Sequence, residues 1–107
     1  MNISCNNPTH YQNAIETLKQ VIDPEIGLNI VDLGLVYELI FSEDNNTLLV
    51  KMTLTTEFCP MGDAIVLDVE NKLKEAFPNY TASVNLSFEP PWSYENISEE
   101  GKEFLTR

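Results

Sequence analysis

The spacing of apolar side chains switches repeatedly between a helical and a strand period, and this switching constrains the fold more than any other feature of the chain. Spacing at i, i+3, i+4 and i+7, which is typical of amphipathic helices, covers residues 9–22 and 60–76. Strand patterns, either rich in β-branched and aromatic residues or alternating in polarity, cover residues 35–41, 47–56 and 80–88. Ser98 is placed to cap a short last helix that ends at Leu105. The predicted order is helix, strand, strand, helix, strand, helix.

Local signals mark the ends of these elements. Thr9 and Gln12 form a capping-box pattern at the start of the first helix, and Pro24 should end that helix at the preceding residue. Pro60 suits the first position of the second helix, because its missing N–H has no helical partner there. The polar residues 42–46 join two strands, which predicts an antiparallel hairpin. Together the elements predict one α+β domain over residues 1–107, with a small mixed three-stranded sheet packed with helices.

The chain is strongly acidic, with 17 Asp and Glu residues against 6 Lys and Arg and a net charge of −11. A field of this sign repels phosphate groups, so nucleic acid and anionic membranes are poor partners. A cation or a basic protein surface fits better, although strong acidity also serves solubility alone. No apolar run approaches the ~18 residues that span a bilayer, and the first residues lack the features of a secretory signal. We therefore expect a cytoplasmic protein whose two cysteines are free thiols.

Cys59 is the first candidate for chemistry. If the second helix begins at Pro60, Cys59 is its N-cap, where the helix dipole favours a thiolate and lowers the thiol pKa. The neighbouring Glu57 and Asp63 act in the opposite direction, because their negative charge raises a thiol pKa. Spacing alone leaves two readings open, a reactive thiolate and a small packed hydrophobic residue.

A second candidate is the acidic segment between the first helix and the first strand. Asp23, Glu25 and Asp32 place three carboxylates within ten positions. Carboxylates so grouped can bind a hard cation, or take up a proton if one pKa is raised by its neighbours. The structural alternative is that Asp23 and Asp32 order the backbone through side-chain hydrogen bonds, as in Asx turns. Taken alone, the segment favours the structural alternative.

The third candidate is the segment at residues 89–92, where two prolines end the last strand. Trp92 either packs on the core or serves as an exposed contact, and core packing is the favoured reading. The sequence contains no zinc signature, and His10 is its only histidine. Nothing in the sequence supports a catalytic pair between Cys59 and His10.

These sites taken together resemble the SufT/PaaD-like small domain family, whose members assist iron–sulfur cluster assembly. The matching motifs lie at residues 23–25, 30–36, 54–55, 59–62, 89–92 and 98–100. Their order and separation, over almost the whole chain, carry the resemblance more than any single motif does.

The resemblance implies an α/β fold, frequent homodimers and a role in maturing iron–sulfur proteins. It also implies that Cys59 is the reactive cysteine and the residue that contacts metal or cluster. The supporting residues are Asp23, Glu25, Asp32, Thr55 and Glu89.

A single cysteine cannot hold a cluster alone, because clusters normally take four thiolates. A homodimer would supply two from Cys59, with the rest from a thiol cofactor or a client, so we expect a transient iron–sulfur cluster rather than a permanent cofactor. The partners would be iron–sulfur carrier or client proteins. No general base is evident beside Cys59, which favours an assembly factor over an enzyme. Two alternatives stay open: a non-metal interaction module that docks a carrier or client, and an accessory subunit of a PaaD-type ring-oxidising complex.

Overall fold

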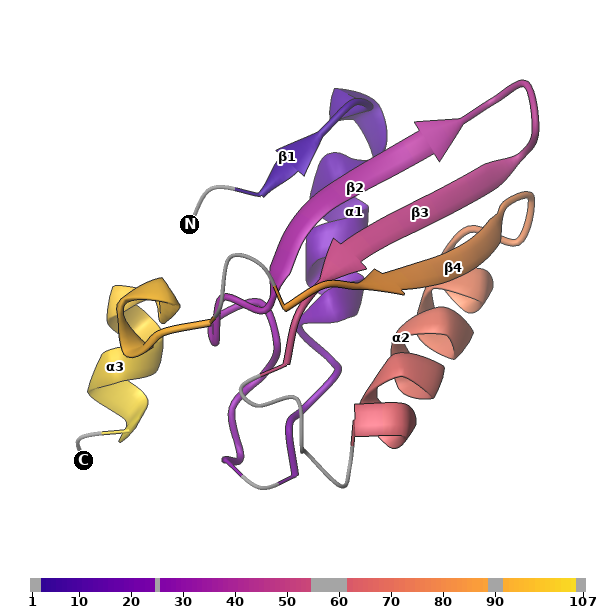
Figure 1. Cartoon of the computed structure of the whole chain (residues 1–107). Coiled ribbons are helices and arrows are strands. Elements are labelled where there is room, and N and C mark those ends of the chain that lie inside the picture. Colours follow the sequence, from indigo (N-terminus) through magenta and orange to yellow (C-terminus); the bar gives the residue numbers. More distant parts are fainter. Residues whose placement is uncertain (1–2, 25, 55–61, 89–91, 106–107) are drawn as a thin grey trace.

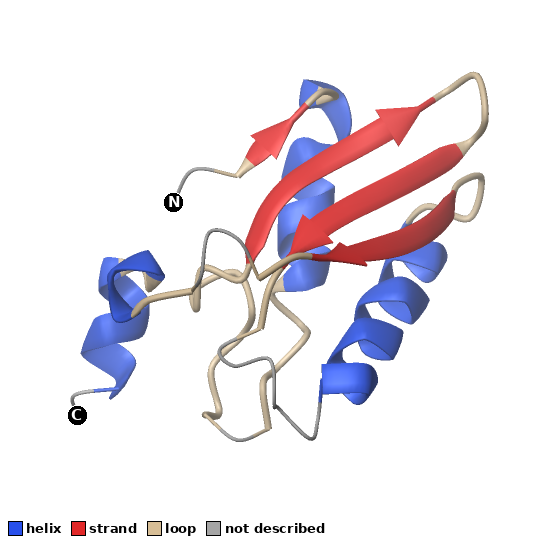
Figure 2. Cartoon of the chain, viewed as in Figure 1, coloured by secondary structure: helices blue, strands red, loops and turns tan. Residues whose placement is uncertain are grey.

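A four-stranded sheet with two helices packed on one face forms the centre of the molecule (Figure 1). The computed structural model describes residues 3–24, 26–54, 62–88 and 92–105. In chain order the elements are β1 (Ser4–Cys5), α1 (Pro8–Leu18), β2 (Val36–Ser42), β3 (Thr47–Met52), α2 (Gly62–Ala76), β4 (Thr81–Leu86), the 3-10 turn η1 (Tyr94–Asn96) and α3 (Glu99–Leu105). Figure 2 shows α1 behind the sheet, α2 alongside β4 and α3 at one end of the molecule. The mixed α and β class is therefore confirmed.

The sheet has four strands in the order β1-β2-β3-β4, so the prediction of three strands, with a helix as the first element, is wrong. β1 runs parallel to β2, β2 antiparallel to β3, and β3 parallel to β4. The predicted hairpin is the β2–β3 pair. The missed strand β1 is two residues long, and so short a segment has no period that a sequence can display.

Alternation along the strands places one row of side chains on the helices. Leu48, Val50 and Met52 are fully buried, as their spacing predicts. Val50 lies opposite Leu39 on β2 and Val84 on β4, so the row continues across the sheet. The helices complete the core with buried side chains from Ala14, Ile15, Leu18, Ile65, Val69 and Leu73. The opposite face of the sheet, turned toward the viewer in Figure 1, carries no helix of the described part of the chain.

α1 is shorter than its apolar spacing predicts. Its N-cap is Asn7, whose side-chain oxygen accepts a hydrogen bond from the N–H of His10 (3.1 Å), so the predicted cap at Thr9 is wrong. The helix ends at Leu18, and the N–H of Val21 donates to the Leu18 carbonyl (3.0 Å) in the turn that follows. Val21 is fully buried although it lies in a loop. Because Val21 is buried at a position that fits the helical spacing, the apolar pattern extends beyond the end of the helix.

The other boundaries differ from prediction by a few residues, a common uncertainty at element ends. β2 is displaced by one residue, and β3 and β4 are shorter than their alternating patterns. The predicted start of the second helix at Pro60 lies outside the described residues. Ser98 caps α3 as predicted, since its Oγ accepts a hydrogen bond from the N–H of Gly101 (3.0 Å). Among the helices described here, none has the length and apolar character to cross a membrane.

Candidate functional site

Two of the six predicted site residues, Asp23 and Asp32, belong to the described part of the chain. The other four lie outside the described residues, and they are Glu25, Thr55, Cys59 and Glu89. The proximity of the carboxylates to Cys59 therefore stays a prediction. What the structure defines is the loop that carries Asp23 and Asp32, together with the two elements that come before and after Cys59 in the chain.

Backbone hydrogen bonds close the first part of that loop, which we call the carboxylate loop (residues 23–35). The N–H of Asp23 donates to the carbonyl of Leu28 (3.0 Å), and the N–H of Gly27 donates to the carbonyl of Asp23 (2.7 Å). Gly27 has a φ of +82°, in the left-handed region that favours glycine. Asp23 is 1% exposed. The turn therefore holds Asp23 inside the loop rather than on its surface.

Asp32 is the centre of a hydrogen-bond network in the second part of the loop. Its two carboxylate oxygens accept separate bonds from Asn29 Nδ2 (2.6 Å) and Ser98 Oγ (2.9 Å). Its N–H donates to Asn29 Oδ1 (2.8 Å), and its carbonyl accepts from the N–H of Ser98 (2.8 Å). These bonds match the structural alternative, in which the carboxylate orders the backbone. The relation of Asp32 to Cys59 stays a prediction.

The C-terminal segment (residues 92–105) is fastened to the same loop at further points. The indole N–H of Trp92 donates to the carbonyl of Leu33 (2.7 Å), and its ring packs, partly buried, against the core, so the prediction of core packing is confirmed. Gly34 has a φ of +76°, and a Cβ there would lie 2.7 Å from the carbonyl carbon of Asn96. Both the conformation and the close approach require glycine. The segment thus fixes the loop just before β2 begins.

Tyr37 connects this region to the sheet. Its hydroxyl is hydrogen-bonded with the side chains of Thr53 and Asn96. Burial raises the pKa of Tyr37 above its ordinary value, and the two hydrogen bonds oppose that rise. Thr53 is fully buried and directly follows β3. The three side chains therefore tie β2, the end of β3 and the turn η1 into one unit.

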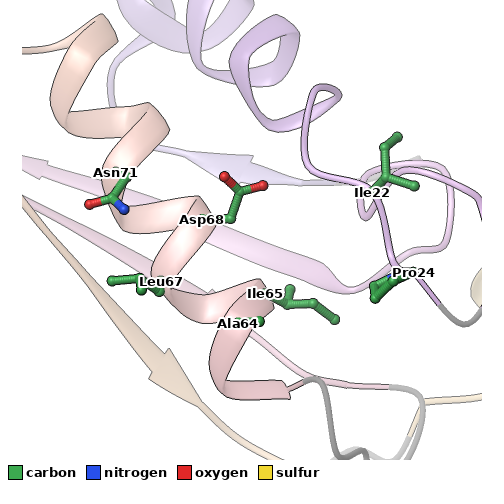
Figure 3. A pocket seen from close by; sticks show the side chains of 7 residues that line it. All are labelled: Ile22, Pro24, Ala64, Ile65, Leu67, Asp68 and Asn71. Carbon is green, nitrogen blue, oxygen red and sulfur yellow. The ribbon is translucent and has the colours of Figure 1, made fainter.

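A pocket of about 390 Å³ lies between the start of the carboxylate loop and α2 (Figure 3). Ile22 and Pro24 line it from the loop side. From α2 the lining residues are Ala64, Ile65, Leu67, Asp68 and Asn71. Ile22 is 47% exposed and Leu67 is 57% exposed, which is high for such large apolar side chains. The first turns of α2 and the loop thus share an accessible, partly apolar surface.

Within the described residues, no group of three or more His, Cys, Asp or Glu side chains is arranged to hold a metal ion. Cys5 is a free cysteine whose Sγ donates to the carbonyl of Asn7 (3.3 Å) and accepts from the N–H of Asn7 (3.5 Å). It lies on β1 at one edge of the sheet, whereas α2 packs against β4 at the other edge. Three strand spacings of about 4.8 Å separate those edges. Cys5 is therefore remote from the start of α2.

His10 lies among aromatic rings. Its ring centroid is 5.2 Å from that of Phe41, 5.1 Å from that of Phe77 and 5.9 Å from that of Tyr80. Phe77 directly follows α2, whose 15 residues span roughly 22 Å. His10 is therefore at the end of α2 opposite to Gly62.

The ordering contacts of the loop include residues that the sequence did not single out: Asn29, Tyr37, Thr53 and Asn96. No motif marks Tyr37 or Asn96, because their hydrogen bond joins a strand to a turn far along the chain. Asn29 does carry a signal. An Asn three residues before an Asp, in a loop that contains Pro and Gly, favours a bond from side chain to backbone.

Comparison with known proteins identifies the family. Residues 12–86 match the model of a family described as iron–sulfur cluster assembly protein. The chain belongs to this iron–sulfur cluster assembly family. The match ends at residue 86, so Trp92 and Ser98, which fasten the carboxylate loop of this family member, lie beyond the matched residues.

Individual relatives agree with this assignment. The Fe-S protein maturation auxiliary factor SufT of Staphylococcus aureus is 42% identical over 82 residues, which cover 77% of this chain and 92% of the relative. The Fe-S protein maturation auxiliary factor YitW of Bacillus subtilis is 37% identical over 91 residues, covering 85% and 88%. The crystal structure of a domain of unknown function, DUF59, from Bacillus anthracis matches with a TM-score of 0.85, 39% identity and 92% coverage of both chains. The resemblance to SufT-like proteins is therefore confirmed.

Proposed function

We propose that this chain is a non-catalytic auxiliary factor that helps iron–sulfur clusters reach client proteins. The observation that carries the proposal is the match to two relatives, SufT and YitW, over most of their length and of this chain. Both relatives are named as auxiliary factors for the maturation of Fe–S proteins. In this role the partners are iron–sulfur carrier or client proteins, and the site of action is the cytoplasm.

Cys59 is the residue that we assign to the sulfur chemistry. It belongs to residues 55–61, which connect the end of β3 to the start of α2. The two ends of this connection are in contact, since Gly62 is buried and a Cβ on it would lie 2.7 Å from Leu54 Cδ1. A short connection with fixed ends before a helix is a common setting for a functional residue. In the predicted position as helix N-cap, Cys59 would also have its thiolate favoured by the helix dipole.

The cluster is cargo in this proposal. Four thiolates normally hold a cluster, and Cys5 lies on the edge strand away from α2. A homodimer therefore supplies one Cys59 from each chain, and a thiol cofactor or the client supplies the rest. An incomplete ligand set of this kind makes release to a client easy, which fits transient binding. The carboxylates at Asp23 and Asp32 are proposed as supporting groups near Cys59.

Anaerobic reconstitution with iron and sulfide tests the proposal. The whole chain, Cys59→Ala and the matched control Cys5→Ala are compared by visible absorbance and by native mass spectrometry. We expect iron-dependent absorbance, and a mass equal to two chains plus a cluster, for the wild type and for Cys5→Ala only. Absorbance retained by Cys59→Ala would show that another residue binds the cluster. A second readout is complementation of a deletion strain, which Cys59→Ser should fail to give.

A non-metal interaction module is the second candidate, and the pocket beside the carboxylate loop favours it. Ile22 and Leu67 expose large apolar surface there, as a docking site for a carrier or client would. On this reading Ile22→Ser and Leu67→Ser abolish client maturation, whereas Phe104→Ser, an exposed apolar control on α3, does not. Thiol labelling separates the candidates further. Fast labelling of Cys59 at neutral pH supports transfer, and an inert Cys59 supports the module.

A further inference from the structure

β4 is the outer strand of the sheet, and half of its backbone groups point away from β3. The N–H of Thr81 donates to the carbonyl of Asn46 (2.8 Å), and the N–H of Ser87 donates to the carbonyl of Met52 (3.0 Å). These bonds run inward. Because successive residues of a strand direct their N–H and C=O groups to opposite sides, the backbone groups of Ala82, Val84 and Leu86 point outward. No strand of the described part of the chain pairs with them.

The opposite edge of the sheet is protected. There β1 covers β2 for only two residues, and the chain then places the side-chain amide of Asn6 against Phe41. Asn6 Nδ2 donates to the Phe41 carbonyl (2.9 Å), and Asn6 Oδ1 accepts from the Phe41 N–H (2.8 Å). The amide thus occupies the two groups that a further strand would need. Edge strands left without such protection are templates for pairing.

Within the described residues, β4 lacks three common protective features of an edge strand, namely a bulge, a charged side chain and a proline. Its register with β3 is regular from Thr81 to Leu86, without a bulge. Residues 76–88 contain no Asp, Glu, Lys, Arg or His, in a chain with 17 acidic and 6 basic residues, and the strand itself contains no proline. Leu86, 39% exposed, adds apolar surface on the helix side of the strand. An uncharged, regular edge that no described strand pairs with, in a chain of net charge −11, is a template on which another strand can pair.

The charged groups near this uncharged edge are mostly acidic; Lys51, opposite Asn85 on β3, is itself ion-paired with Glu38 (3.5 Å). Thr81 adjoins the β2–β3 turn, whose exposed residues include Glu43 and Asp44. α2, which packs against β4, carries four acidic residues and two lysines, the latter being Lys72 and Lys74. A second copy of the chain would bring equal negative charge to the same place. A partner with basic residues on either side of an uncharged stretch is complementary instead.

We propose that β4 binds an extended segment of a partner polypeptide as a fifth strand of the sheet. The segment is uncharged and apolar at alternate positions, so that these side chains lie beside Ala82, Val84 and Leu86, and it has Lys or Arg at its ends. Main-chain hydrogen bonds to the outward groups of β4 supply affinity, and the flanking charges supply orientation. No residue of β4 lines the pocket beside the carboxylate loop, and the proposal does not depend on the role of Cys59.

Amide hydrogen exchange of the whole chain, measured by NMR, tests this proposal. The probe is an acetylated peptide in which three valines alternate with two threonines between lysine pairs. In the free protein the outward amides of Ala82, Val84 and Leu86 exchange faster than the inward amides of Ser83 and Asn85. With peptide, exchange of the three outward amides should slow by about tenfold or more. A matched peptide with glutamates in place of the lysines should bind about tenfold more weakly.

Two blocking experiments complete the test. Methylation of alternate peptide nitrogens removes the donors that face β4 and should abolish protection. Val84→Pro removes an outward N–H without breaking the bonds to β3 and should weaken binding, whereas Asn85→Ala on the open face should not. The proposal would be overturned by any of three results: protection of β4 by the methylated peptide, changes in NMR chemical shift confined to Ile22 and Leu67, or no protection at all. Protection that rises with protein concentration alone would also overturn it, since the occupant would then be a second copy.

Discussion

Replacing Ser98 with alanine tests whether α3 fastens the carboxylate loop. Ser98 Oγ donates to the carboxylate of Asp32 and accepts from the N–H of Gly101, so one atom serves both the loop and the helix cap. Loss of a helix cap costs about 1 kcal/mol, and loss of a hydrogen bond to a charged group costs about 1.5–3 kcal/mol. Water replaces part of the lost bonding, because Ser98 is only half-buried. We therefore expect the free energy of unfolding to fall by about 2 kcal/mol.

Ser98→Asp is the matched variant that separates the two functions of this hydroxyl. Aspartate caps helices as well as serine does, but here it brings a second carboxylate against Asp32. If capping alone matters, Ser98→Asp keeps wild-type stability; if the contact with Asp32 matters, it loses at least as much as Ser98→Ala. Urea unfolding followed by the fluorescence of Trp92, the single tryptophan, gives the free energy. The alanine variant should also melt roughly 8–15 °C lower.

The result that would refute this reasoning is equally specific. Suppose that Ser98→Ala unfolds within about 0.5 kcal/mol of the wild type, the range of ordinary surface substitutions, or that Ser98→Asp is more stable than the wild type. Either outcome would mean that the bond between Asp32 and Ser98 does not hold the loop. Amide exchange at Gly101 supplies an independent check, since it should accelerate only if the cap of α3 is lost.

Four further substitutions, of which Gly27→Ala is a matched control, test three separate contacts. Gly34→Ala should lower the free energy of unfolding by more than about 2 kcal/mol, because it combines backbone strain with a clash against Asn96. Gly27→Ala has the same kind of backbone strain but open space around it, so it should cost about 1 kcal/mol. Equal losses of stability in thermal unfolding would contradict the clash. Tyr37→Phe should cost about 1 kcal/mol through its lost hydrogen bonds. The pKa of Tyr37 in the folded protein is raised above 10.0, so wild-type stability should fall as the pH rises from 10.0 toward the folded pKa, and it should fall less in Tyr37→Phe. Tyrosinate absorbance measures the titration, and urea unfolding measures the stability. Identical pH profiles of stability in the two proteins would contradict the assignment. Asn6→Ala should cost about 1 kcal/mol by freeing the backbone of Phe41, and unchanged urea unfolding would show that the amide adds nothing.

The parts of the fold that follow from burial could be predicted from the sequence. Leu48, Val50 and Met52 alternate because one face of β3 lies on the helices, and that alternation is visible in the chain itself. The two-residue strand β1 could not be predicted, because it exists only through its pairing with β2. The end of α1 at Leu18 differs from the prediction for a related reason. Val21 is buried by a loop, and burial alone does not reveal which backbone conformation achieves it.

The candidate site likewise contains residues that the sequence could predict and contacts that it could not. The charge and grouping of Asp23 and Asp32 mark them as candidates in the sequence, and both are buried in the loop between the first helix and the hairpin. The partner that holds Asp32 from outside the loop is Ser98, which the sequence marks as a helix cap and as part of the motif at residues 98–100, but not as a partner of Asp32. Nothing local in the chain indicates that a cap and a carboxylate 66 residues apart share a hydrogen bond. Contacts of that kind depend on the tertiary arrangement and leave no periodic trace.

The bond between Asp32 and Ser98 also bears on the order in which the molecule forms. The β2–β3 hairpin closes across a turn at residues 43–46, whereas this bond must close a separation of 66 residues. Closing a long stretch of chain costs more entropy than closing a short one, so local pairs form first. We therefore expect the hairpin early and the carboxylate loop late. During synthesis, the carboxylate loop would therefore lack its contact with Ser98 until α3 has left the ribosome. The sheet would fold before the candidate site is ordered.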